Sequence, residues 1–221
     1  MLRFAFCLAA ALAALTLSTG APVAADLPLL AVDDFSSGRA AGWRPSDPAH
    51  WRVGEEGGRH YYELTSPGSP SKIRAPTSWS LLKDHDVSAF VFSGRLRCHA
   101  DPANSRRDMD ILFYFKDAEH FAYVHFAASS DEVHNIIGLV DGADRVKVNI
   151  EPAGAPPARL TGREWHAFKV AADGAGRVEA YLDDMIKPVL TARLSARRRG
   201  LVGVGSFDDT GAFADLCLWG K

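Results

Sequence analysis

The stretch of residues 165–184 constrains the fold more than any other part of the chain. In its second half, apolar Val178, Ala180 and Leu182 alternate with polar or aromatic neighbours, and its first half alternates in the same way. A period of two is the pattern of a β-strand with one buried face. Between the halves lies Asp-Gly-Ala-Gly at 173–176, whose glycines tolerate the positive φ angles of tight turns. The stretch therefore predicts a half-buried antiparallel hairpin.

Short alternating segments of the same kind recur along the rest of the chain, separated by Gly, Pro and Ser. Residues 51–64 read as a second hairpin around a Gly-Gly pair. Residues 110–150 read as a meander of three or four antiparallel strands, which is the arrangement of one jelly-roll sheet. No amphipathic helix of three turns stands out. These patterns predict an all-β chain, and 221 residues suit one such domain.

The segments after the first hairpin carry a resemblance to known folds. A proline-containing strand at 187–190 is followed by a Gly-rich strand at 200–207 and an Asp-bearing last strand at 213–219. This order resembles that of laminin-G-like and concanavalin-like jelly rolls. One departure is Asp184, where that family usually has glycine. The resemblance covers about residues 30 to 219, and it implies a two-sheet antiparallel jelly-roll β-sandwich.

The N-terminus has the form of an export signal. Arg3 precedes an apolar run at residues 4–17, and small residues stand directly before Asp26. We therefore predict a signal peptide at 1–25 and a single mature domain at 26–221, exported to the periplasm or beyond. The apolar run is shorter than the roughly 20 residues that a membrane span needs, although a retained N-terminal anchor is the alternative.

The charge balance argues against nucleic acid as a partner. Removal of the signal peptide takes away one base and no acid, which leaves 24 Lys and Arg against 27 Asp and Glu. A formal charge of −3 on the mature chain gives no overall field that would attract nucleic acid or anionic lipid.

Two cysteines remain once Cys7 leaves with the signal peptide. Cys98 shares strand parity with Leu96, and Cys217 shares it with Trp219, so both are predicted to be buried. An exported protein permits disulfides, and the two strands lie close together in similar folds. The sequence leaves two hypotheses open: a bridge between these residues, or two buried thiols that pack as small apolar groups.

Parity along the meander gathers polar and aromatic side chains on one face of the sheet. The predicted ligand-binding set is Asp108, Asp110, Tyr114, Tyr123 and His125. Aromatic rings beside hydrogen-bonding groups suit sugars, whose C–H faces pack on aromatics. We therefore expect a secreted carbohydrate-binding domain that is not catalytic. The alternative is an ordinary solvated sheet face with cross-strand pairs, in a structural or adhesive module.

Two further resemblances point to hydrolysis as the alternative function. Asp108-Met109-Asp110 resembles the cleft motif of family 16 glycoside hydrolases, but Leu112 follows where that motif has its third acid. A retaining mechanism needs two carboxyl groups about 5 to 5.5 Å apart. The overall pattern also resembles the 3-keto-disaccharide hydrolases, whose Asn-Ser-Gly stretch has a partial counterpart at 104–106.

The resemblance also implies a calcium site. In similar sandwiches the first and last strands pair, which would bring Asp34 close to Asp215 and to the acids at 208–209. Calcium takes six to eight oxygen ligands, and carboxylates from distant parts of the chain would supply the charge. The alternative is that these aspartates are turn residues.

The histidines and glycines do not form a recognisable zinc-binding, phosphate-binding or nucleophile motif. His120, His125 and His134 are clustered, but they show none of the spacings that are typical of zinc ligands. We expect them to be hydrogen-bonding histidines. The sequence has no Gly-rich phosphate loop that opens a helix and no Gly-x-Ser-x-Gly nucleophile turn.

Overall fold

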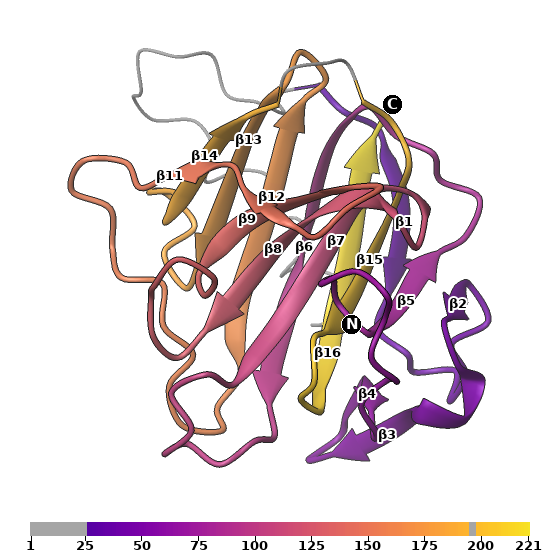
Figure 1. Cartoon of the computed structure of the whole chain (residues 1–221). Coiled ribbons are helices and arrows are strands. Elements are labelled where there is room, and N and C mark those ends of the chain that lie inside the picture. The colour runs from indigo at the N-terminus through magenta and orange to yellow at the C-terminus, as the bar shows by residue number, and fades with distance from the viewer. Residues whose placement is uncertain (1–25, 195–197) are drawn as a thin grey trace.

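The computed structural model describes residues 26–194 and 198–221, and it confirms the predicted all-β fold. Two antiparallel sheets pack face to face in a jelly-roll β-sandwich (Figure 1). The predicted signal peptide at 1–25 lies outside the described residues. Across the described part of the chain, no helix is long and apolar enough to cross a membrane.

The nine-stranded sheet contains both chain ends of the domain. Its order is β11 (Asn149–Ile150), β14 (Leu190–Arg193), β13 (Arg177–Leu182), β12 (His166–Asp173), β6 (Ala89–Cys98), β16 (Gly211–Gly220), β4 (Arg59–Leu64) and β3 (Trp51–Glu56), with β1 (Leu29–Asp33) paired to β16. The first and last strands therefore pair, as the resemblance implied.

The seven-stranded sheet contains the predicted meander. Its order is β10 (Val146–Lys147), β9 (Ile136–Asp141), β8 (His120–Ala127), β7 (Asp108–Asp117), β15 (Leu201–Ser206), β5 (Ser78–Leu82) and β2 (Trp43–Pro45). A 3-10 turn, η1 (Pro48–His50), precedes β3. The last meander strand, predicted as continuous over 145–150, is divided: β10 pairs with β9, whereas β11 pairs with β14 in the other sheet.

The predicted hairpin forms β12 and β13, and local chemistry explains its turn. The carboxylate of Asp173 accepts hydrogen bonds from the backbone N–H groups of Ala175 (2.7 Å) and Arg177 (3.0 Å). Gly174 and Gly176 adopt φ angles of +74° and +107°, which side chains disfavour. The turn and the alternation therefore specify the same hairpin.

The seven-stranded sheet is buried on both faces. One face packs on the core between the sheets, where Ile111, Phe113, Val124 and Phe126 are fully buried. The other face carries a second apolar cluster, which consists of Ala75, Leu81, Leu112, Phe115, Phe121, Tyr123, Val140 and Phe207. The face that we expected to be open to solvent is therefore covered.

Two bulges shift the parity that the sequence suggested. Tyr114 adopts φ +54°, and the β7–β8 register shifts after Phe113. As a result the Tyr114 ring packs in the core between the sheets, and its hydroxyl donates to the Ser88 carbonyl (2.8 Å). Tyr114 therefore does not belong to the ligand-binding face, and its assignment to that face was wrong.

The second bulge lies at Asp215 in β16, where φ is +54°. It turns Leu216 and Leu218 into the core, while Cys217 pairs with Ser93. Cys98 pairs with Gly211, five residues further along β6, and is a buried free thiol. The bridge between Cys98 and Cys217 is therefore not formed. Burial raises the pKa of the Cys98 thiol to about 12, so it packs as a small apolar group.

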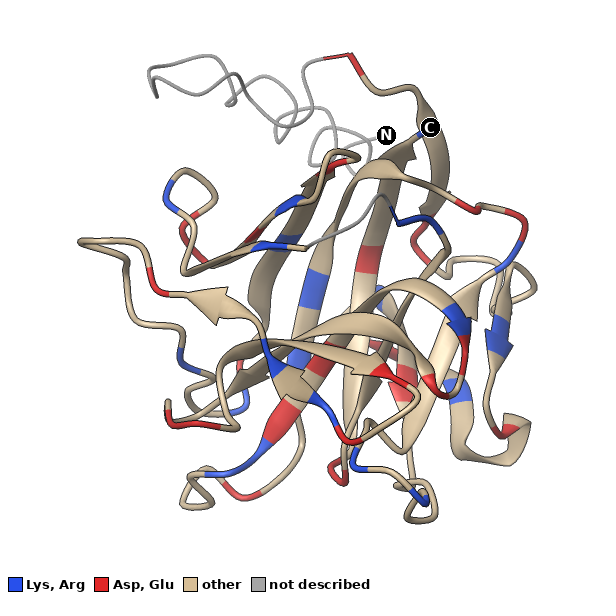
Figure 2. Ribbon diagram, turned by 45° about the horizontal axis from the view of Figure 1, so that its top comes forward, with Lys and Arg blue, Asp and Glu red and all other residues tan. Residues whose placement is uncertain are grey.

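Figure 2 shows basic and acidic residues interspersed over the ribbon, without a large region of one sign. This distribution agrees with the near-neutral formal charge of the chain.

Candidate functional site

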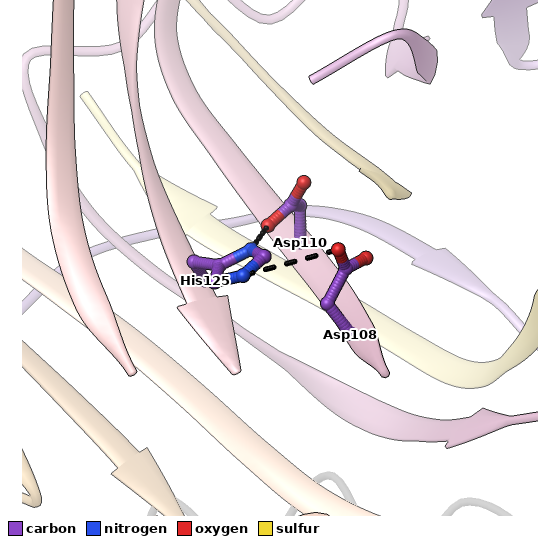
Figure 3. A group of neighbouring side chains, drawn as sticks. All are labelled: Asp108, Asp110 and His125. Atoms are coloured by element: carbon purple, nitrogen blue, oxygen red, sulfur yellow. Dashed lines mark hydrogen bonds and ion pairs between the residues drawn. The ribbon is translucent and has the colours of Figure 1, made fainter. Parts of the chain in front are cut away.

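Three of the predicted residues meet on the outer side of β7 and β8. The strand register places Asp110 directly opposite His125, with Asp108 two residues away on the same face. The Nδ1 atom of His125 lies 2.7 Å from Oδ1 of Asp110, and its Nε2 atom lies 3.8 Å from Oδ2 of Asp108 (Figure 3). The imidazole ring thus stands between two carboxyl groups, which we call the Asp–His–Asp centre.

The turn between β15 and β16 holds Asp108 in place. The Asp108 carboxylate accepts hydrogen bonds from the Ser206 hydroxyl (2.5 Å) and the Phe207 N–H (3.1 Å). In return, the Asp209 carboxylate accepts one from the Asp108 N–H (2.8 Å). These bonds bring the acids of the turn, Asp208 and Asp209, to the edge of the centre.

Burial dominates the electrostatics of the centre. It raises the pKa of Asp108 to about 8 and that of Asp110 well above its usual range, with Arg145 opposing the shift at Asp110. Burial also lowers the pKa of His125. Each shift has the same cause, because a low-dielectric site disfavours the charged form of any group without a close counter-charge.

Several buried polar atoms near the centre have no hydrogen-bond partner among the described residues. They are Oδ2 of Asp110, the hydroxyl of Tyr123 and Nη1 of Arg145. An unsatisfied buried polar group costs about 1 to 3 kcal/mol, and such groups call for a specific explanation.

Tyr123 lies on the predicted face but is fully buried there. Its ring crosses Gly138 on β9, where an added Cβ would lie 2.4 Å from the ring. It also contacts the rings of Phe121, His125 and Phe207. Tyr123 and His125 were expected to face solvent, and the structure corrects that expectation: both are part of a covered layer.

The cover comes from the β4–β5 connection. The Thr77 hydroxyl donates to the Phe207 carbonyl, the Arg74 N–H donates to the Asp144 carboxylate (2.7 Å), and the Arg145 N–H donates to the Arg74 carbonyl (3.0 Å). These bonds link the connection to the β9–β10 and β15–β16 turns. The sequence shows residues 66–71 only as a Ser, Pro and Gly loop, and such long-range contacts leave no local signal.

A pocket of about 300 Å³ opens between these segments. It is lined by residues 70–75 and by Gly68, Thr77, Asp144, Phe207 and Asp208. Phe207 separates the pocket from the Asp–His–Asp centre, because its ring also lies edge-on to His125 at 5.2 Å between centroids. The guanidinium groups of Arg74 and Arg145 lie 5.3 and 4.5 Å from the Phe207 ring centroid. Strand parity in the sequence does not predict this pocket.

Two overlapping groups of side chains have the geometry of a metal site. Asp108, Asp110 and His125 form one, Asp108, Asp208 and Asp209 form the other, and the potential ligand atoms of each group lie within 4.8 Å of one another. Asp108 belongs to both groups. The structure thus contains an acidic site that has the donors for a cation, at a place that the sequence did not predict.

Asp34 and Asp215 have different surroundings from those we expected. The Asp215 carboxylate lies 3.5 Å from Nε of Arg95 and 3.7 Å from Nε of Arg59, and Oδ1 of Asp34 accepts the Ser36 N–H (2.9 Å). The acids at 208–209, which were expected beside them, lie at Asp108 instead. The ion pairs of Asp215 already supply the positive charge that a calcium ion would bring.

Comparison with known proteins supports the fold. No protein-family model matches the sequence, and no curated protein matches it. Among solved structures, a carbohydrate-binding module CBM66 from Bacillus subtilis is 18% identical, with a TM-score of 0.56 over 80% of this chain and 95% of that chain. Domain 4 of AbnA, a GH43 extracellular arabinanase from Geobacillus stearothermophilus in complex with arabinotriose, is 8% identical, with a TM-score of 0.58 over 89% and 94% of the two chains.

A third similar structure is a putative glycosyl hydrolase from Parabacteroides distasonis. It is 12% identical to this chain and has a TM-score of 0.54, over 86% of this chain and 94% of that one. At these identities the shared feature is the sandwich itself, which agrees with the concanavalin-like resemblance.

Proposed function

We propose that this protein is a secreted carbohydrate-binding β-sandwich that takes its ligand in the pocket beside Phe207. The observation that carries the proposal is the pocket itself. It combines charged and hydroxyl groups from Arg74, Thr77, Asp144 and Asp208 with apolar contacts from Ile73 and the largely buried Phe207, on the sheet face that holds the Asp–His–Asp centre. The first two solved structures named above are a carbohydrate-binding module and an arabinanase domain with arabinotriose, which supports this class of ligand.

The composition of the pocket suits a saccharide. Sugars need donors and acceptors in fixed directions, together with a small apolar surface. Carboxylates at Asp144 and Asp208 accept from sugar hydroxyls, while Arg74 and Lys72 donate to them. A volume of about 300 Å³ is at the small end of ligand sites, which favours the end of a glycan chain over a long internal stretch.

A glycan array probed with the mature chain, residues 26–221, tests the proposal. We expect selective binding to glycans that share a terminal sugar. If the folded protein binds no glycan on an array of broad composition, the proposal is wrong. The same array, analysed for product after incubation, addresses the hydrolase alternative. That alternative is the weaker one, because Asp108 and Asp110 are buried behind Phe207 rather than exposed in the pocket.

Replacing Arg74 with alanine should weaken binding of the array ligand by about tenfold or more, since a hydrogen bond to a charged group is worth about 1.5 to 3 kcal/mol. Isothermal titration calorimetry measures the change. Arg193→Ala is the matched control, because Arg193 is an exposed arginine on β14 of the other sheet. Equal losses of affinity in both variants would mean that the ligand does not bind in the pocket beside Phe207.

Secretion is part of the same proposal. We expect the exported protein to begin at Asp26, since small residues at 23–25 precede it. N-terminal sequencing of protein from the periplasm or the medium measures this directly, and an intact Met1 on exported protein would contradict it.

A further inference from the structure

We propose that His125 and Asp108 bind a divalent transition-metal ion of the zinc type, with the carboxylates of Asp208 and Asp209 as the remaining protein donors. Asp110 is the positioning residue that orients His125. This inference concerns the Asp–His–Asp centre and holds whether or not the neighbouring pocket takes a sugar.

One nitrogen of His125 is available to a metal ion. The side chain is only 3% exposed, and its Nδ1 is bound to Asp110. Within the described part of the chain, Nε2 makes no hydrogen bond, and the Asp108 oxygen at 3.8 Å is too distant for one. Two ligands of a tetrahedral zinc ion stand about 3.4 Å apart, given metal–ligand bonds of about 2.1 Å. The gap between Nε2 and the Asp108 carboxylate is therefore close to the separation of two ligands on one ion.

The other nitrogen of His125 is held as it is in metal-binding histidines. A histidine that binds metal through one nitrogen usually donates the N–H of the other to a carboxylate, which fixes the tautomer and the ring orientation. Asp110 occupies this position at 2.7 Å from Nδ1, on the strand directly opposite His125 (Figure 3). With the proton on Nδ1, the lone pair of Nε2 points toward Asp108.

The site gathers several carboxyl groups in a buried place. Asp108 and Asp110 are almost completely buried, and the half-buried Asp209 lies against the Asp108 N–H. Within the described residues, the Arg107 guanidinium next to them in sequence donates instead to the carbonyls of Gly162 and Leu160. Arg145 offsets part of the burial cost at Asp110. Burying several carboxyl groups together is nevertheless expensive, and a divalent cation offsets that cost. Asp208 is exposed, so the group has a side that an ion can reach from solvent.

The donor set selects among cations. Imidazole nitrogen with carboxylate oxygens suits zinc and related first-row metals. Calcium prefers six to eight oxygen ligands, so a site that includes a histidine nitrogen binds it less well. The alternative is a calcium site made of carboxylate oxygens alone, from Asp108, Asp208 and Asp209. The experiment therefore has to distinguish it from a zinc site that includes His125.

The test uses the mature chain after treatment with a chelator and gel filtration. One equivalent of zinc chloride, manganese chloride or calcium chloride is added, and bound metal per chain and the melting temperature are measured. We expect one zinc ion per chain and a higher melting temperature, because an ion that binds only the native state stabilises it. His125→Gln and Asp108→Asn should each abolish stoichiometric uptake. Asp110→Asn should weaken zinc affinity by about 10- to 100-fold, as is typical for residues that orient a ligand.

His134→Gln is the matched control. The His134 ring lies 5.5 Å from the His125 ring between centroids, but its Nδ1 is bound to Asp131, so uptake should be unchanged. Circular dichroism verifies that each variant is folded. Should a buried variant fail to fold, Asp209→Asn replaces it, since the amide oxygen can still accept the Asp108 N–H.

Three results would overturn the inference. One is a folded wild-type chain that binds no metal, and another is zinc uptake that persists in both His125→Gln and Asp108→Asn. The third is uptake of calcium alone that survives His125→Gln and is lost in Asp209→Asn, which would establish the oxygen-only site instead.

Discussion

Replacing Val124 with aspartate is expected to leave the chain largely unfolded. Val124 is fully buried in β8 between Ile111 and Ile137 of the neighbouring strands, within the core between the two sheets. An unpaired carboxylate there has no counter-charge and no water, so the loss should exceed about 4 kcal/mol. Domains of this size have about 5 to 15 kcal/mol of stability in total.

Urea unfolding followed by tryptophan fluorescence measures this loss, and Val124→Ala is its control. Alanine removes two methyl groups without adding charge and should cost about 2 kcal/mol. Similar midpoints for the aspartate and alanine variants would mean that Val124 does not face the core.

Tyr123→Ala should cost about 3 to 5 kcal/mol, the range for truncating a large buried aromatic side chain. The ring is fully buried between Gly138, Phe121 and Phe207, on a sheet face that the β4–β5 connection covers. An exposed aromatic on an open sheet would lose far less. The same urea measurement therefore distinguishes a covered face from an open one.

Tyr123→Phe separates packing from hydrogen bonding at this position. The Tyr123 hydroxyl is buried without a partner among the described residues, so its removal should be neutral or slightly stabilising. A loss of more than about 1 kcal/mol in Tyr123→Phe would show that the hydroxyl makes a stabilising hydrogen bond.

Local patterns were enough to predict the hairpin at 165–184 and the pairing of the meander strands. In both cases the turn chemistry and the alternation act within a few residues. The same alternation placed Asp108, Asp110 and His125 on one face, which the register of β7 and β8 confirms.

Parity failed where the chain departs from regular strand geometry. Tyr114 and Asp215 adopt positive φ angles, which cannot be predicted from a tyrosine or an aspartate in the sequence. Each of these bulges moves the residues that follow it to the opposite face of the strand. The assignment of Tyr114 to the binding face was wrong for this reason, whereas Cys217 is buried as predicted.

The pocket could not be predicted from the sequence for a different reason. Its walls come from residues 70–75, Asp144 and the turn at Phe207 and Asp208, which are far apart in the chain. The hydrogen bonds that join them are long-range: the Arg74 N–H bond to Asp144 spans 70 residues, and the Thr77 hydroxyl bond to the Phe207 carbonyl spans 130. The sequence placed Asp108 and His125 on one face but did not predict that Asp208 and Asp209 lie beside Asp108, because those acids come from the distant turn between β15 and β16.

The measurement that tests the central claim most directly is a nuclear magnetic resonance titration of the mature chain with the best ligand from the array. The account predicts that the backbone amide shifts concentrate on residues 70–75, Asp144, Phe207 and Asp208, and that they saturate with the affinity found by calorimetry. Shifts confined to the outer face of the nine-stranded sheet, or no shifts at ligand concentrations that saturate the array signal, would contradict it.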